Sequence, residues 1–273
     1  MMITTQDVMV TRFLRDREKI LAERKKEAFH QIHPYRPLSD MLGDGAWAGM
    51  RCFILGGGPS LEGFNFELLR DKGKIIAINR AFEYAPFADI LFFMDQRFYK
   101  MLHAGRLGLD AQRKWAEFRG HKVFLNILGR QHDDVYSVRS LGRVGISNSL
   151  SKGIYHGNNS GVGALGLAIC LGANPIYLLG FDFKFRHEKS HFHSGYKIPM
   201  KESVVKSFIR DFERMNRFLM RTKFRIINLN PDSALRCFPF STIDEVLGDG
   251  KIHNAEIRPM GEAETQGLQN DVL

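Results

Sequence analysis

The sequence predicts an α/β protein of the Rossmann-like type, with helices on both faces of a mainly parallel sheet and a helical arm at its N-terminus. Two observations lead to this fold class. Short apolar runs alternate with helical patterns along the middle of the chain, as they do where parallel strands are buried on both faces. One such run, 51–55, ends in three glycines followed by Pro59 and Ser60, which is typical of a strand that enters a helix through a tight loop.

The elements follow in order. Residues 1–46 are expected to form the helical arm, 47–247 a nucleotide-binding catalytic domain, and 248–273 a polar, poorly ordered tail. Apolar runs predict six strands, at 51–55, 74–79, 88–94, 122–127, 175–180 and 225–230. Helical patterns predict helices at 61–71, 96–105, 110–120, 160–171 and 202–222. The polar stretch 128–159 has no strong period, which predicts a long active-site loop.

Composition narrows the class of protein. The chain has 273 residues and a net charge of +9, which favours an anionic partner. The cysteines Cys52, Cys170 and Cys237 are odd in number and widely spaced, so they indicate neither a zinc site nor a disulfide framework. No apolar run approaches the roughly 18 residues of a membrane-spanning helix, and the charged N-terminus does not resemble a signal peptide. We therefore expect a cytoplasmic protein, whose oligomeric state the residues do not fix.

Polar residues follow nearly every predicted strand. Because ligands of open parallel sheets bind outside the carboxyl ends of the strands, this recurrence predicts a polar crevice along one edge. The alternative is that Asp and Asn simply end strands well. In chain order the residues are the loop Gly56–Ser60, then Asn79, Arg80, Asp95, Asp182 and Asn230.

The loop Gly56–Ser60 is the strongest local pattern. It matches neither the dinucleotide fingerprint G-x-G-x-x-G nor the P-loop G-x-x-x-x-G-K-[ST]. Its glycines would let the backbone approach a phosphate or ribose, and Ser60 would cap the following helix. Alternatively, the loop is only a tight turn between a strand and a helix. Asn158, Asn159 and Ser160 present a similar choice between receiving a phosphate or nucleobase and capping the helix that follows them, and one residue could do both.

Two further positions are candidates for catalysis. Asp95 would help to hold a divalent metal, position an acceptor hydroxyl or cap the next helix, and the absence of a D-x-D pattern leaves the metal undecided. The cluster of His187, His191 and His193 invites a zinc interpretation, but its spacing needs a helix and its neighbours favour a loop. A single histidine acting as general base or acid requires less.

The ordered series ILGGGPSL, IAINRAFEYAPFADILFFMD, NNSGVGALGLAICLGANPIYLLGFDF, KSHFHS and INLNPDSAL resembles one superfamily. It includes bacterial lipooligosaccharide sialyltransferases with a G-x-G-P-S-L loop, motility-accessory-factor flagellin glycosyltransferases, and archaeal 6-hydroxymethylpterin diphosphokinase-like proteins. The resemblance covers roughly residues 45 to 247. It implies a GT-A-like variant of the Rossmann-like fold.

The sialyltransferase pattern implies roles for individual residues. His191 matches the general base on the acceptor hydroxyl. A tyrosine that assists the leaving phosphate in those enzymes is absent here, and Lys184 or Arg186 would neutralise the phosphate instead, which suits a different donor. Donor-binding positions are Gly56, Gly57, Gly58, Pro59 and Ser60 for the phosphate and sugar, Asn79 for the nucleotide-sugar, and Asn159, Ser160 and Gly161 for the nucleoside.

Three functions follow as hypotheses. The first is a glycosyltransferase that uses a nucleotide-sugar donor, with a glycan, a protein or a nucleic acid such as DNA as acceptor. The second is an ATP-dependent diphosphokinase that acts on a hydroxymethyl compound and needs Mg²⁺ held by Asp95 and Asp182. The third is a nucleotide-binding or nucleic-acid-binding protein without turnover, because fold does not imply function.

Overall fold

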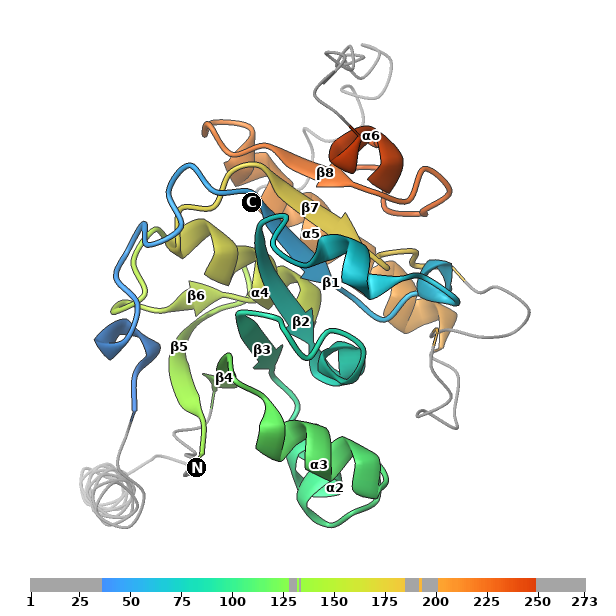
Figure 1. Cartoon of the computed structure of the whole chain (residues 1–273). Coiled ribbons are helices and arrows are strands. Elements are labelled where there is room, and N and C mark those ends of the chain that lie inside the picture. The colour runs from blue at the N-terminus through green and yellow to red at the C-terminus, as the bar shows by residue number, and fades with distance from the viewer. Residues whose placement is uncertain (1–35, 128–131, 133, 185–191, 193–200, 249–273) are drawn as a thin grey trace, which may run out of the picture.

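A computed structural model describes residues 36–127, 132, 134–184, 192 and 201–248 of the chain (Figure 1). Within these residues the core is one eight-stranded sheet with the order β6-β5-β4-β3-β2-β1-β7-β8, and all its strands are parallel. This confirms the predicted Rossmann-like α/β class. The expected helical arm lies outside the described residues up to residue 35, and the expected tail lies outside them from residue 249. The strands are β1 (Cys52–Leu55), β2 (Lys74–Ile78), β3 (Ile90–Phe93), β4 (His121–Asn126), β5 (Tyr136–Gly142), β6 (Ile154–Tyr155), β7 (Ile176–Leu179) and β8 (Ile226–Asn228).

Both faces of the sheet are covered, as the continuous apolar runs predicted. All four residues of β1 are fully buried: Cys52 and Ile54 belong to one core, and Phe53 and Leu55 belong to the other. The first core is closed by α4 (Ser160–Cys170) and α5 (Glu202–Leu219). The second is closed by α2 (Gln96–His103), α3 (Leu109–Glu117) and α6 (Ile243–Leu247), together with several short 3₁₀ turns (Figure 1).

The glycines of α4 allow that helix to lie directly on the sheet. A Cβ atom at Gly163 would lie 2.9 Å from the ring of Phe92 in β3, and one at Gly161 would lie 2.7 Å from the ring of Phe181 after β7. The small residues of α4 therefore allow close packing of this helix on the sheet. The first two turns of α4 consequently lie near the carboxyl edge of the sheet, between β3 and β7. None of the helices in the described part of the chain has the length and apolar character that crossing a membrane requires.

The predicted helix at 61–71 is wrong. The segment forms two 3₁₀ turns instead, η2 (Pro59–Leu61) and η3 (Phe66–Leu69). Gly63 lies between them with φ +75°, in the left-handed region, which interrupts a right-handed helix. Asn65 then begins η3, since its side chain accepts a hydrogen bond from the N–H of Glu67. Two further 3₁₀ turns are η1 (Leu38–Asp40) and η4 (Asn79–Glu83).

The stretch 128–159 is not one long loop. It contains β5 and β6, which extend the sheet beyond β4, although 128–131 and 133 lie outside the described residues. In β5 only Ser137 and Val138 are buried, whereas Arg139 and Leu141 are exposed. Such a strand lacks the apolar run that identified the central strands.

The strand order changes direction at β1. From β1 the chain adds β2 to β6 successively on one side, and then returns through α4 to place β7 on the other side. Leu55, the last residue of β1, is in register with Ala77 of β2 and Leu179 of β7. The segments that leave β1 and β7 therefore lie next to each other at the carboxyl edge, which is where ligands of open parallel sheets bind.

Candidate active site

Backbone hydrogen bonds join the glycine loop to the segment that leaves β7. The N–H of Gly56 donates to the carbonyl oxygen of Leu179 at 2.8 Å, and the N–H of Gly58 donates to that of Gly180, also at 2.8 Å. The sequence-predicted loop Gly56–Ser60 is thereby brought into contact with the segment Gly180–Asp182, which contains the predicted site residue Asp182, at the switch between β1 and β7.

The carboxylate of Asp182 fastens this junction. Only 4% of Asp182 is exposed. Its Oδ2 accepts a hydrogen bond from the N–H of Ser60 at 2.6 Å, and its Oδ1 accepts one from Ser60 Oγ at 2.5 Å. Oδ1 also accepts a hydrogen bond at 2.9 Å from Nδ2 of Asn230, which follows β8. One side chain thus connects the exits of three neighbouring strands.

Gly56 and Gly58 are required for this packing. A Cβ atom at Gly56 would lie 2.6 Å from the carbonyl oxygen of Gly180, and one at Gly58 would lie 2.5 Å from Asp182 Oδ1. These glycines therefore allow the loop to pack closely against the segment that leaves β7. The expected helix cap at Ser60 is wrong, because η2 begins after Gly58 with Pro59 as its first residue and has no side-chain cap. The hydroxyl of Ser60 instead contacts Asp182.

Asn159 caps α4 at the same edge of the sheet. Its Oδ1 accepts a hydrogen bond from the N–H of Val162 at 2.9 Å, so the predicted capping role is confirmed. Only 7% of Asn159 is exposed, and its Nδ2 is buried without a hydrogen-bond partner among the described residues. The N–H groups at the start of this eleven-residue helix add a partial positive charge, which favours an anion. Ser160 and Gly161 lie in this first turn.

Asn79 leaves β2 with an unusual backbone. Its φ is +50°, in the left-handed region, and its Oδ1 is buried without a hydrogen-bond partner in the described part of the chain. Buried polar atoms are nearly always paired, so an unpaired carboxamide at a strand exit indicates a place for a ligand or water. Asn79 offers an acceptor and Asn159 a donor.

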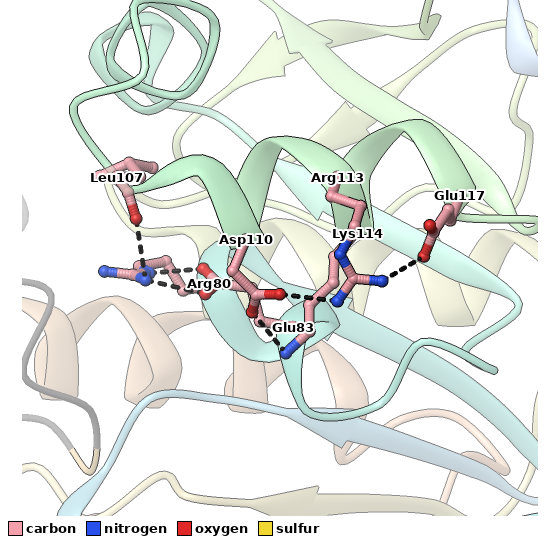
Figure 2. Close-up of polar contacts among 7 residues, drawn as sticks. All are labelled: Arg80, Glu83, Leu107, Asp110, Arg113, Lys114 and Glu117. Atoms are coloured by element: carbon pink, nitrogen blue, oxygen red, sulfur yellow. Dashed lines mark hydrogen bonds and ion pairs between the residues drawn. The ribbon is translucent and has the colours of Figure 1, made fainter.

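An ion pair stabilises the turn that follows Asn79 (Figure 2). Arg80 donates from Nε to Glu83 Oε1 at 2.5 Å and from Nη2 to Oε2 at 2.8 Å, and Nη2 also contacts the carbonyl oxygen of Leu107 at 3.5 Å. The side chains of Arg80 and Glu83 are only 12% and 8% exposed. The pair therefore holds η4 against the segment before α3.

Sequence reasoning missed Asp211, which supports the N-terminal turn of α4. Its side chain is 1% exposed, and its Oδ2 accepts a hydrogen bond from the N–H of Asn158 at 3.0 Å. Arg214 lies 3.3 Å and Arg143 lies 3.9 Å from Oδ1, which partly balances the buried charge. The available signal was an acidic residue one turn before Met215 on the apolar side of an amphipathic helix.

His156 is another buried polar residue near this turn. It is 5% exposed, and within the described residues its Nδ1 has no hydrogen-bond partner. Burial lowers the pKa of His156, and the positive charge of Arg143 lowers it further, whereas Asp211 acts in the opposite direction. The imidazole is thus held in its neutral form more strongly than in water.

The three residues predicted to be catalytic are Asp95, Lys184 and His191. Two of them are exposed, and the third lies outside the described residues. Asp95 is exposed, and its Oδ1 caps α2 by accepting a hydrogen bond from the N–H of Arg97 at 2.7 Å. Lys184 is exposed. His191 lies outside the described residues. Phe192 follows it in the sequence, and its N–H donates to the carbonyl oxygen of Gly57 at 3.0 Å.

The acidic residues of the candidate site already have hydrogen-bond partners within the protein. No group of three or more His, Cys, Asp or Glu side chains suited to a metal ion occurs among the described residues. The carboxylate of Asp182 already accepts three hydrogen bonds, and Asp95 caps a helix, so both proposed Mg²⁺ ligands have other partners. The residues present do not fit the expected Mg²⁺ site.

Comparisons with known proteins add two structural likenesses. No protein-family model and no curated protein sequence matches the chain. A structure of the sialyltransferase CstII from Campylobacter jejuni with cytidine-5'-monophosphate is 18% identical, with a TM-score of 0.41, over 71% of this chain and 85% of that one. A structure of the sialyltransferase CST-II with a trisaccharide acceptor and CMP is also 18% identical, with a TM-score of 0.42. The match covers 74% of this chain and 89% of that one. These values assign neither a family nor an activity.

Proposed function

We propose that this protein is a glycosyltransferase that moves a sugar from a nucleotide-activated donor to an acceptor hydroxyl. The observation that carries the proposal is that two amide atoms, Asn79 Oδ1 after β2 and Asn159 Nδ2 at the start of α4, are buried without hydrogen-bond partners in the described residues. A nucleoside offers both donors and acceptors, so it would satisfy both groups.

The donor's phosphate would bind at the start of α4. Backbone N–H groups of Ser160 and Gly161 belong to the first turn of this helix, where the helix dipole favours negative charge. The glycine loop, fixed by Asp182, would form the opposite side of the crevice, with Pro59 and Ser60 toward the sugar. In this arrangement the loop glycines shape the site through packing.

The chemistry assigned to the site is a displacement at the anomeric carbon. The acceptor oxygen forms a bond to that carbon, the bond to the nucleotide phosphate oxygen breaks, and His191 takes the hydroxyl proton. Negative charge then develops on the leaving phosphate, which Lys184 would stabilise. The contact of Phe192 with Gly57 supports the assignment of His191, because the neighbouring residue lies on the glycine loop.

The acceptor stays among three classes: a glycan, a protein hydroxyl or a nucleic acid. The net charge of +9 favours an anionic acceptor. If the acceptor is DNA, activity should fall steeply as salt concentration rises. The occupied carboxylates of Asp182 and Asp95 favour glycosyl transfer over Mg²⁺-dependent diphosphate transfer.

A thermal-shift screen against nucleotides and nucleotide-sugars, with and without Mg²⁺, tests the donor class first. Stabilisation by a nucleoside mono- or diphosphate in the absence of metal supports the proposal. A shift that needs both ATP and Mg²⁺ would instead support the diphosphokinase hypothesis. No shift with any nucleotide would contradict a nucleotide site.

Asn159→Ser tests the site itself. Serine keeps the helix cap but removes the buried Nδ2 donor, so stability should change by less than about 1 kcal/mol while nucleotide affinity falls about tenfold. Asn158→Ser is the matched control, because the side chain of Asn158 is exposed. Equal nucleotide affinity in both variants would remove Asn159 from the site.

His191→Ala separates an enzyme from a binding protein. With the identified donor, this variant should bind the nucleotide normally and lose turnover by about 100-fold or more. Turnover at the wild-type rate would contradict the assigned base. If the wild type binds nucleotide but transfers sugar to none of the three acceptor classes and does not hydrolyse the donor, the non-catalytic hypothesis is favoured.

A further inference from the structure

A cavity of about 540 Å³ lies at the edge of the sheet opposite to the candidate active site. It is bounded by residues that enter β1, β2 and β3, whereas the active site uses residues that leave the strands. Its volume is within the range of about 300–1,000 Å³ that small-molecule pockets occupy. Its lining includes Met50, Arg51, Arg70, Asp71, Lys72, Gly73, Lys74, Ile75, Phe87 and Asp89.

Two of the basic side chains that line this cavity are paired with carboxylates. Lys74 Nζ lies 2.7 Å from Asp89 Oδ1, and Asp89 Oδ2 accepts a hydrogen bond from the N–H of Ile75 at 2.9 Å. Arg70 pairs with Glu67 at 2.6 Å. These contacts neutralise Lys74 and Arg70, so neither is the main source of positive potential.

Arg51 and Lys72 supply the uncompensated charge. Neither has an ion-pair partner among the described residues, and Arg51 Nη1 contacts only the neutral carbonyl oxygen of Val246 at 3.3 Å. Asp71 is the one acidic lining residue besides the neutralised Asp89, and it is exposed. With Asp71 counted against Arg51 and Lys72, the lining keeps one net positive charge, and a concave surface of this kind attracts anions.

The position of Arg51 is fixed by its neighbours. Gly73 has φ +157°, and a Cβ atom there would lie 2.5 Å from Arg51 Cγ and 2.8 Å from the Arg51 carbonyl oxygen. The absence of a side chain at Gly73 thus makes room for the stem of Arg51. The hydrogen bond from Nη1 to Val246 orients the guanidinium, and such prior orientation lowers the entropic cost of engaging a ligand.

One wall of the cavity is aromatic. The guanidinium carbon of Arg70 lies 4.2 Å from the centre of the Phe87 ring, in a cation–π contact. Met50 is also exposed at the cavity, with 46% of its surface accessible. The cavity therefore combines cations with a surface against which an organic group can pack.

We propose that this cavity binds a small phosphate ester, with the phosphate held by Arg51 and Lys72 and the organic group against Phe87 and Met50. The planar guanidinium of arginine matches two phosphate oxygens at once, and a lysine ammonium adds a point charge. This site is separate from the proposed glycosyl transfer and does not depend on it.

Calorimetric titration of the full chain with glucose 6-phosphate, inorganic phosphate and glucose tests the site. Saturable binding of the ester is expected, with weaker binding of inorganic phosphate and none of glucose. Lys72→Glu should weaken ester binding by about tenfold or more. Its matched control is Lys152→Glu, since Lys152 is exposed and lies between β5 and β6. Arg51→Gln should have an effect of similar size.

Lys72→Glu keeps the test informative if Arg51→Gln fails to fold, because the exposed Lys72 side chain can change without disturbing the core. The proposal is overturned if the ester fails to bind at concentrations up to about 10 mM, or if Lys72→Glu binds it as the wild type does. Loss of ester binding in Asn159→Ser alone would move the ligand to the candidate active site. Tighter binding of a short duplex DNA through the same two residues would overturn the assignment to a small ligand.

Discussion

Asp182 and Ser60 are 122 positions apart in the sequence, yet the Asp182 carboxylate accepts hydrogen bonds from both the N–H and the Oγ of Ser60. These two contacts hold the glycine loop after β1 against the segment after β7. Together with the backbone hydrogen bonds of Gly56 and Gly58, this buried side chain therefore sets the shape of the candidate active site.

Asp182→Ala should destabilise the protein by about 3 kcal/mol, because it leaves the Ser60 N–H and the Asn230 amide without their acceptor. Urea unfolding measures the change. Asp232→Ala is the control, since Asp232 is exposed and should tolerate the substitution. Equal stability of the two variants would show that the Asp182 contacts do not hold the loop.

Gly56→Ala should cost about 1–3 kcal/mol of unfolding free energy, because the new methyl group would lie 2.6 Å from the backbone oxygen of Gly180. Gly43→Ala provides the comparison, since nothing lies within 4 Å of a Cβ atom there. Thermal unfolding of both variants gives the measurement. A Gly56→Ala protein with wild-type stability would mean that β1 and β7 separate readily at this edge.

Arg80→Gln should destabilise the protein by about 3 kcal/mol, because it leaves Glu83 as a buried, unpaired carboxylate. Figure 2 also contains the matched control: Arg113 pairs with Asp110 and Glu117, but its side chain is 59% exposed. Arg113→Gln should therefore have little effect on chemical denaturation. If both variants lost a similar free energy of unfolding, burial would not explain the stabilising effect of the Arg80–Glu83 pair.

Protein stability should fall as the pH drops below about 6.5. The folded-state pKa values of His156 and His121 are lowered from 6.5, mainly by burial, so the unfolded chain binds protons on these side chains at a higher pH than the folded chain does. Above that pH neither form is protonated and the contribution is constant. Urea unfolding at about pH 7.5 and about pH 5.5 should show a smaller difference for His156→Gln than for the wild type. An unchanged difference would contradict the contribution of His156.

The central strands could be predicted because they are buried on both faces and consist of apolar runs. The two strands at one side of the sheet were harder to predict from the sequence. β5 mixes exposed and buried residues, and β6 has only two residues, so neither produces a clear hydrophobic pattern. The helix predicted at 61–71 was wrong because Gly63 has a left-handed backbone conformation. The amino-acid composition of this segment does not indicate that conformation.

The candidate site was predictable in outline only. Polar residues at strand ends predicted a site at the carboxyl edge, which stays a prediction, and of the two alternatives for Asn159 the helix cap was confirmed. The contacts of Asp182 with Ser60 and of Asp211 with Asn158 join residues far apart in the chain, so local patterns could not predict them. The glycines were recognised, but their packing partner at Gly180 appears only once β7 is placed beside β1.

The return of the chain to β1 also has a consequence during synthesis. When β1 to β6 have left the ribosome, the glycine loop after β1 is already outside. The segment after β7, which contains Asp182 and holds that loop, has not yet emerged. Non-local pairings of this kind form late and slow the folding of a domain. A nascent chain that ends before Asp182 therefore has the glycine loop but lacks the carboxylate that holds it in place.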